Sequence, residues 1–228
     1  MTASTMKSKL YQFYPSPFCA KVRKILEYKG IEFEVVEVDY LERKELLLAS
    51  GQLMVPAVTL DNGETIADSA RIALRLEELY PEPTIFPSGW RGMHVVLADY
   101  IDNQLEDALY RVALADEFAF YSSQGADRGA LWRLIRERKY GAGFVDRVIA
   151  DHAANWEHAR AALAPFEEQL ASTPFLTGRI GLADFALYGQ LFYFAFTGEQ
   201  KIPADMKNLR AFFGRVGRIS SVLEDSSG

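Results

Sequence analysis

Cysteine and histidine are scarce in this sequence of 228 residues, which holds one cysteine, Cys19, and three histidines. A single cysteine excludes an internal disulfide framework and any metal site built from several cysteines. It also fits a reducing compartment, and we expect the protein to be cytoplasmic. The histidines are His94, His152 and His158. They show neither i, i+4 pairing nor a carboxylate cluster, so we expect them on the surface and expect no metal.

Long apolar runs and an excess of positive charge are also missing. No stretch approaches the roughly 20 apolar residues that cross a bilayer, and the first ten residues lack the apolar segment of a signal peptide. The net charge of −6 argues against a nucleic-acid surface and gives no reason to expect membrane binding. With 49% hydrophobic and 25% charged residues, the composition is that of an ordinary globular protein.

The first 80 residues mix strand and helix signals. Alternating or β-branched segments predict strands over 9–14, 32–39, 56–60 and 64–66, and amphipathic segments predict helices over 17–29, 42–49 and 68–80. The resulting order, βαβ-α-ββα, predicts a small α/β domain. Its first two strands should be parallel, with a right-handed crossover between them.

A proline-rich segment, residues 81–91, separates this pattern from a purely helical one. We therefore expect a first domain over 1–82, a linker over 83–91 and an all-helical domain over 92–228. The helices of the second domain are expected near 91–121, 127–139, 142–171, 181–197 and 208–219.

The start of the first predicted helix has the residue types of an anion-binding site. Ser16 is a good N-cap, Pro17 suits the first helical position, and Cys19 lies one turn further on. A helix N-terminus presents unpaired N–H groups and partial positive charge, which stabilise an anion, including a thiolate. The segment therefore predicts an anion or thiolate site.

Two further segments fit a peptide-like ligand. Pro56 opens a strand, where proline is often cis, and a cis bond would leave the Val55 main chain free to pair with an extended peptide. Asp68 and Ser69 place an acceptor and a donor at another helix start, which suits an amino-acid head group. A ligand that uses both would bring its middle residue to Ser16.

These segments resemble the cytosolic glutathione transferases. The resemblance rests on S-P-F-C-A-K-V-R from residue 16, V-P-A-V from 55, A-D-S-A-R-I from 67 and F-L-T-G-R-I-G-L-A-D-F-A-L from 175. It implies a thioredoxin-like N-terminal domain, an all-helical C-terminal domain, glutathione as co-substrate and a homodimer. Gly181 departs from the family pattern, because a serine or threonine cap usually stands three positions before the residue matching Asp184.

The resemblance also implies roles for single residues. Ser16 matches the catalytic serine of the theta- and zeta-like classes and the first cysteine of the omega-like C-P-x-C motif. The glutathione-binding residues it implies are Phe18, Gln52, Val55, Pro56, Asp68 and Ser69. Gln52 is included as a substitute, because Met54 occupies a position that is often polar in the family.

Two other residues compete with Ser16 for the glutathione sulfur. Tyr14 ends the first strand, where the tyrosine-type classes carry their donor. Cys19 groups with Val22 and Leu26 on the apolar helix face, so we expect it to be buried. An exposed Cys19 would instead support thiol transfer.

The predicted function is that of a glutathione transferase-like enzyme, which activates the glutathione thiol for attack on a small hydrophobic electrophile. Glutathione-dependent reduction through Cys19, a non-catalytic ligand-binding role, and isomerase or ether-cleaving chemistry remain alternatives. We expect the second-substrate pocket between the domains, lined by the helix that starts near residue 91 and by the 142–171 helix. Its candidate residues are Tyr100, Gln104, Asp107 and Arg111, with Asn103 and Tyr110 on the same stretch.

Overall fold

The computed structural model describes residues 7–198 and 201–219. Its N-terminal part contains β1 (Ser8–Gln12), α1 (Pro17–Tyr28), β2 (Phe33–Glu37), α2 (Lys44–Ser50), β3 (Ala57–Thr59), β4 (Thr65–Ala67) and α3 (Ser69–Leu79). The predicted order of strands and helices is confirmed.

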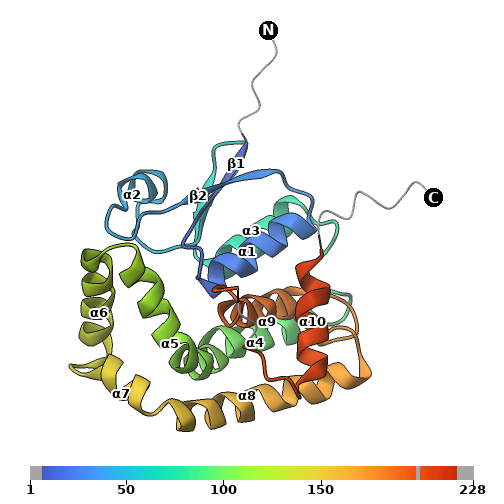
Figure 1. Cartoon of the computed structure of the whole chain (residues 1–228). Coiled ribbons are helices and arrows are strands. Elements are labelled where there is room, and N and C mark those ends of the chain that lie inside the picture. Colours follow the sequence, from blue (N-terminus) through green and yellow to red (C-terminus); the bar gives the residue numbers. More distant parts are fainter. Residues whose placement is uncertain (1–6, 199–200, 220–228) are drawn as a thin grey trace.

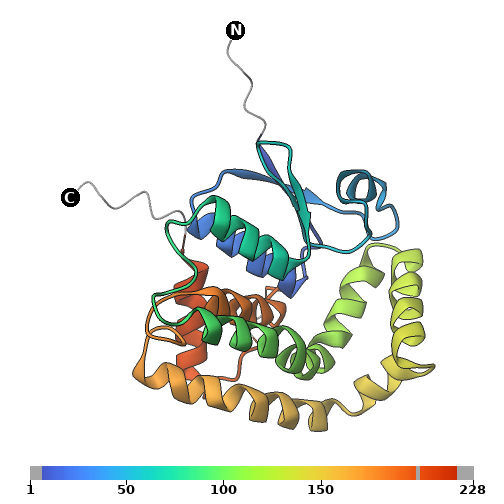
Figure 2. The ribbon, with the colours of Figure 1, turned by 180° about the vertical axis from the view of Figure 1, so that it is seen from behind.

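The four strands form one mixed sheet in the order β2-β1-β3-β4. Strand β1 pairs with β2 in parallel and with β3 antiparallel, and β3 pairs with β4 antiparallel. Neighbouring residues of β1 point to opposite faces, because side chains alternate along a strand. Leu10 joins the core beneath α1 and α3, whereas Tyr11 packs with Leu46 of α2. Helices α1 and α3 therefore cover the face of the sheet that is turned toward the helical part (Figures 1 and 2).

After residue 90 the described chain contains helices and no strand. The elements are α4 (Arg91–Tyr100), the π-helical turn η1 (Ile101–Leu105), α5 (Glu106–Ser123), α6 (Ala126–Tyr140), α7 (Phe144–Ala150), α8 (His152–Ser172), α9 (Leu182–Tyr193) and α10 (Lys207–Gly217). The run predicted over 91–121 is helical throughout and contains the π turn. The run predicted over 142–171 divides into α7 and α8 at Asp151.

Helix α9 lies at the centre of the helical part, directly against α1 (Figure 1). Every residue of α9 except Phe192 is buried. Gly189 allows the close approach, because a Cβ there would overlap the main-chain oxygen of Pro17. This packing fixes the N-terminus of α1 at the junction between the sheet-containing part and the helices.

No helix within the described residues has both the length and the apolar character needed to cross a membrane.

Candidate functional site

The N-terminus of α1 is incompletely capped. Ser16 has extended main-chain geometry, and its Oγ accepts from the Cys19 N–H at 3.4 Å, which is long for a hydrogen bond. The Phe18 N–H has no hydrogen-bond partner within the described residues. The first turn holds no acidic side chain. The positive end of this helix dipole therefore remains available to an external anion.

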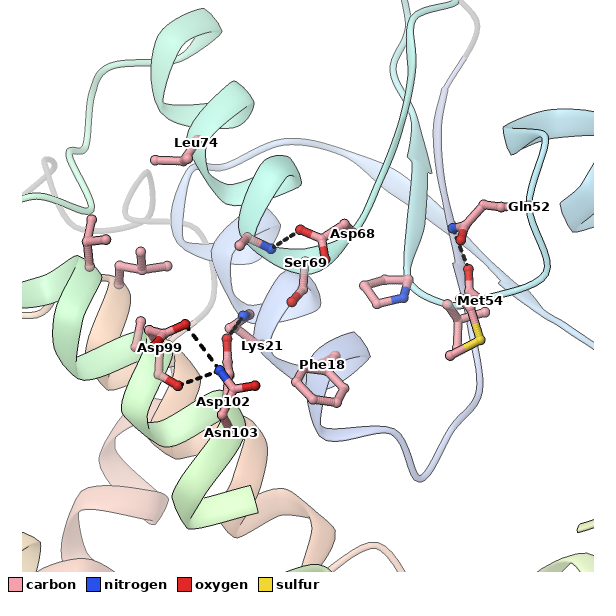
Figure 3. A pocket seen from close by; sticks show the side chains of 16 residues that line it. Phe18, Lys21, Gln52, Met54, Asp68, Ser69, Leu74, Asp99, Asp102 and Asn103 are labelled. Atoms are coloured by element: carbon pink, nitrogen blue, oxygen red, sulfur yellow. Dashed lines mark hydrogen bonds and ion pairs between the residues drawn. The ribbon is translucent and has the colours of Figure 1, made fainter. Parts of the chain in front are cut away.

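A cavity of about 580 Å³ lies beside this helix start, within the size range of small-molecule sites. Its walls come from α1, from the loop before β3, from the start of α3 and from α4 with η1. Figure 3 shows that side chains from these segments face a common space. The lining includes Phe18, Lys21, Gln52, Met54, Val55, Pro56, Asp68, Ser69, Asp99, Asp102 and Asn103. All six residues implied to bind glutathione are among them.

The loop before β3 offers main-chain groups to this cavity. The Val55–Pro56 peptide bond is cis. Neither the N–H nor the C=O of Val55 forms a hydrogen bond within the described residues. The Gln52 amide donates to the Met54 carbonyl at 2.7 Å, which holds the loop in shape (Figure 3). An extended ligand would therefore find both main-chain groups of Val55 unpaired.

The start of α3 forms the other polar end of the cavity. Asp68, which Figure 3 labels at this helix start, accepts from the Ala70 and Arg71 N–H groups at 3.1 and 3.0 Å. Its φ of 78° is the one positive φ among the described non-glycine residues. Such geometry costs about 1–3 kcal/mol and is concentrated at functional sites. The hydroxyl of Ser69, a mostly buried residue, has no hydrogen-bond partner in the part of the chain that is described and lines the cavity.

The opposite wall of the first cavity includes charged residues that sequence reasoning did not find. Lys21 of α1 is 1% exposed and forms an ion pair with Asp102 of η1, which Figure 3 shows between the two elements. Burial raises the pKa of Asp102, and Lys21 opposes that shift. The Asn103 amide donates to the Asp99 main-chain oxygen at 2.8 Å. Lys21 and Asp102 are 81 positions apart, so no local pattern marks the pair.

A second cavity, of about 270 Å³, contains Ser16 itself. It shares Phe18, Met54 and Val55 with the first cavity, so the two spaces adjoin at these three residues. The far wall comes from α5 and α6, which lie side by side in both ribbon views (Figures 1 and 2). Residues from these helices are Glu106, Tyr110, Glu117, Tyr121, Ile135, Arg136, Lys139 and Tyr140. Helix α5 belongs to the run predicted over 91–121, which was expected to line the second-substrate pocket, whereas the 142–171 run, also expected there, contributes no residue to this cavity.

Arg136 organises the polar part of the second cavity. It forms an ion pair with Glu117 at 3.1 Å and donates to the hydroxyls of Tyr110 and Tyr40 at 3.0 and 2.5 Å. Tyr193 donates to the other oxygen of Glu117 at 2.8 Å. Burial raises the pKa of Tyr110, so its phenol stays protonated near neutral pH. The cavity is therefore aromatic, with a fixed polar network on one side.

The two rivals of Ser16 line neither cavity. Tyr14 lines a third hollow, which shares Phe13, Tyr40 and Tyr121 with the second cavity, and its ring contacts Phe192 edge-on at 5.6 Å. Cys19 is fully buried. Burial raises the pKa of its thiol to about 12, although the hydrogen bond to Ser16 opposes the shift. A thiol of this kind is inert near neutral pH.

The candidates for the second-substrate pocket divide into two groups. Asn103 lines the first cavity and Tyr110 the second. Neither cavity is lined by Tyr100, Gln104, Asp107 or Arg111, and Asp107 pairs with Arg111 at 2.9 Å. The π turn η1 adds a residue to one helical turn and so rotates the following residues about the helix axis. A straight 3.6-residue period cannot anticipate that rotation.

His94 corrects another expectation. It was predicted on the surface, but it is fully buried at the start of α9. Its Nδ1 accepts from the Ala183 N–H at 3.2 Å, and its Nε2 lies 2.9 Å from Thr177 Oγ1. A Cβ at Gly181 would overlap the ring. The imidazole thus occupies the place of the cap side chain that Gly181 lacks. Within the described residues, no group of three or more His, Cys, Asp or Glu side chains could hold a metal ion.

Comparisons with known proteins match both parts of the chain to one family. Residues 10–84 match the family described as "Glutathione S-transferase, N-terminal domain", and residues 142–215 match "Glutathione S-transferase, C-terminal domain". A probable glutathione S-transferase of Nicotiana tabacum is 36% identical over 200 residues, covering 72% of this chain and 88% of the relative. A maleylacetoacetate isomerase of Pseudomonas aeruginosa is 35% identical over 86 residues, covering 35% of this chain and 41% of the relative.

A solved structure shows the same fold over most of the chain. The glutathione S-transferase of Ceriporiopsis subvermispora, in complex with glutathione, superposes with a TM-score of 0.79 at 19% identity and covers 94% of this chain and 98% of that one. The predicted architecture, a thioredoxin-like N-terminal domain followed by an all-helical domain, is confirmed. The chain belongs to the glutathione S-transferase family.

Proposed function

We propose that this protein binds glutathione in the first cavity and activates its thiol at Ser16 for attack on a small hydrophobic electrophile held in the second. One observation carries the proposal: the two cavities meet at Phe18, Met54 and Val55, beside the incompletely capped helix start. A tripeptide with its γ-glutamyl end at Asp68 and Ser69 and its backbone at Val55 brings its sulfur to this junction. The sulfur then faces both Ser16 and the space for a second substrate.

The energy required for activation is modest. A free thiol has a pKa near 8.5, and lowering it by about 1.5 units takes about 2 kcal/mol of preferential stabilisation of the thiolate. A hydroxyl hydrogen bond to an anion contributes about 1.5–3 kcal/mol, and the helix terminus adds up to about 1 kcal/mol. Ser16 stays protonated and donates to the sulfur, and the sulfur attacks the electrophile.

Thiol transfer through Cys19 is disfavoured. A mixed disulfide with glutathione needs an accessible thiolate, but this thiol is fully buried and its pKa is raised to about 12. Isomerisation remains compatible with the site, because it uses the same activated thiol, and one relative is named a maleylacetoacetate isomerase.

The test compares Ser16→Ala, Tyr14→Phe and Cys19→Ala. We expect Ser16→Ala to lower turnover of an aryl halide about 10- to 100-fold, which corresponds to the loss of one charge-assisted hydrogen bond. The pKa of bound glutathione, read from its ultraviolet thiolate absorbance, should rise in parallel. A loss that follows Tyr14→Phe instead would refute the serine assignment. Glutathione binding without turnover of any electrophile in a broad panel would indicate a non-catalytic binding protein.

We also propose that the protein is a cytoplasmic homodimer with a role in detoxification, as is typical of the family. The support for a dimer is an exposed apolar face along α4, next to the first cavity. Its members are Trp90, Met93, Val96 and Tyr100, which are 46, 47, 65 and 42% exposed. Sedimentation at micromolar concentration tests this, and Val96→Glu should shift the protein toward monomer.

A further inference from the structure

The second cavity holds a carboxyl group that the proposed function does not use. Glu106 is the first residue of α5, immediately after the π turn, and it lines the same cavity as Ser16. No hydrogen bond or ion pair within the described residues reaches its carboxyl group. Its neighbour Asp107 instead pairs with Arg111 at 2.9 Å and lines neither cavity.

Most of the other charged side chains that line this cavity have partners within the protein. Arg136 pairs with Glu117. Arg43 donates to the Tyr40 and Leu53 carbonyls at 3.2 and 3.1 Å. Lys139 lies over the Tyr140 ring, with Nζ 4.7 Å from its centre. Among the Glu, Lys and Arg side chains that line this cavity, those of Glu106 and Lys139 have no hydrogen-bonded partner in the described part of the chain.

The surroundings of Glu106 favour its protonated form. Burial raises the pKa of its carboxyl to about 7, and Lys139 of α6 opposes that shift. The carboxylates of Asp107, Glu117 and Asp102 act in the same direction as burial, and the value of about 7 includes their effect. Near neutral pH the group therefore carries a proton that it can give up, as a catalytic acid must.

We propose that Glu106 is the general acid of this enzyme and that the second cavity takes electrophiles with an oxygen leaving group, such as a phenol. The inference rests on the proposed function, because it uses the glutathione thiolate at Ser16 as the nucleophile. The sulfur forms a bond to the electrophilic carbon while the carbon–oxygen bond breaks and its electron pair goes to the oxygen. The Glu106 proton moves to that oxygen, the phenol departs, and solvent reprotonates the carboxylate. Lys139 stabilises the carboxylate between these steps.

A halide needs no proton when it leaves, whereas a phenoxide does, and this difference supplies the test. The probes are 4-nitrobenzyl chloride and a series of 4-nitrobenzyl ethers of phenols of increasing basicity. The variants are Glu106→Gln, which keeps the shape but has no acidic proton, and Glu168→Gln. The second is a matched control, because Glu168 is exposed on α8 and lies outside both cavities.

We expect Glu106→Gln to lower the ratio of ether to chloride turnover about 100-fold, since general acids contribute about 10²- to 10⁴-fold. The loss should grow with the basicity of the phenol. Wild-type ether turnover should fall as the pH rises above about 7, where Glu106 loses its proton, and this fall should be absent in Glu106→Gln. Glu168→Gln should keep both the ratio and the pH profile of the wild type.

Three outcomes would overturn the proposal. Equal losses on both probes would show a merely structural role for Glu106. Chloride turnover by the wild type without ether turnover would refute the inference and leave the proposed function standing. Glutathione binding without turnover of either probe would refute the proposed function and with it this role for Glu106.

Discussion

The N-termini of α1 and α9 lie in helices that pack against each other, but their main-chain N–H groups are used differently. At α9 the Leu182 N–H donates to the Ile85 carbonyl at 2.8 Å, and the Ala183 N–H donates to His94 Nδ1 at 3.2 Å. At α1 the Cys19 N–H reaches Ser16 Oγ at 3.4 Å, and the Phe18 N–H has no partner within the described residues.

The two helix starts also differ in charge. Helix α9 carries its own acid, Asp184, which is buried and accepts from the Gly181 and Leu176 N–H groups at 2.9 Å each. Helix α1 has no acid in its first turn and borders two cavities. A helix N-terminus whose N–H groups are paired within the protein serves stability, whereas one with unpaired N–H groups can stabilise a ligand's charge. The state of the N–H groups, more than the identity of the cap residue, separates a structural helix start from a functional one.

The largest expected loss of stability comes from a change at the N-terminus of α9. Asp184→Ala leaves two buried N–H groups without a partner, and we expect it to lower the free energy of unfolding by about 3–5 kcal/mol. Urea unfolding measures the change. The control is Asp205→Ala, which removes an exposed ion pair with Arg160 and should cost less than about 1 kcal/mol. A cost below about 1 kcal/mol for Asp184→Ala as well would break the distinction between the two helix starts.

A smaller loss of stability is expected from a change at Gly181, where the His94 imidazole takes the place of a cap side chain. Gly181→Ser restores the residue type common in the family, yet its Cβ would overlap the ring of His94. We expect it to destabilise the protein by about 1–3 kcal/mol, as overpacking does. In a His94→Ala background the serine has room to cap α9, so the double variant should be more stable than the sum of the single changes by about 1 kcal/mol or more. Additive unfolding energies would mean that the ring and the cap do not compete for one place.

Sequence reasoning succeeds where a structural feature depends on adjacent residues. Ser16, the Val55–Pro56 bond and the Asp68–Ser69 helix start carry local signals, since caps and turn prolines depend on adjacent residues. The cis bond and the Asp68 cap are present as the sequence indicated, and the order of strands and helices followed from periodicity.

The residues that sequence reasoning missed depend on long-range packing. His94 meets Ala183 across 89 positions, and Arg136 meets Tyr40 across 96. The π turn η1 changes which face of the following helix turns toward Ser16, and it has no signature in hydrophobic spacing. Glu106 therefore could not be placed in the cavity until the turn before it was seen.

The smallest expected effect is a pH dependence of the stability that His94 contributes at the N-terminus of α9. The N–H of Ala183 can only donate, so His94 Nδ1 must be the unprotonated acceptor, and burial lowers the pKa of this histidine from 6.5. The unfolded chain then binds more protons than the folded one just below pH 6.5, so the contribution of His94 is complete above that value and is lost as the pH falls.

Asp184 acts in the opposite sense, because burial raises its pKa to about 7 and the folded state then binds the extra proton. The wild-type profile mixes both groups, whereas the difference between wild type and His94→Asn isolates the histidine. Asparagine stays neutral at every pH, so the stability advantage of the wild type should shrink on going from about pH 7.5 to about pH 5. The measurement is urea unfolding of both proteins at each pH. A difference that stays constant over this range would mean that α9 is not capped by a neutral imidazole, and the contrast with the open start of α1 would then rest on Asp184 alone.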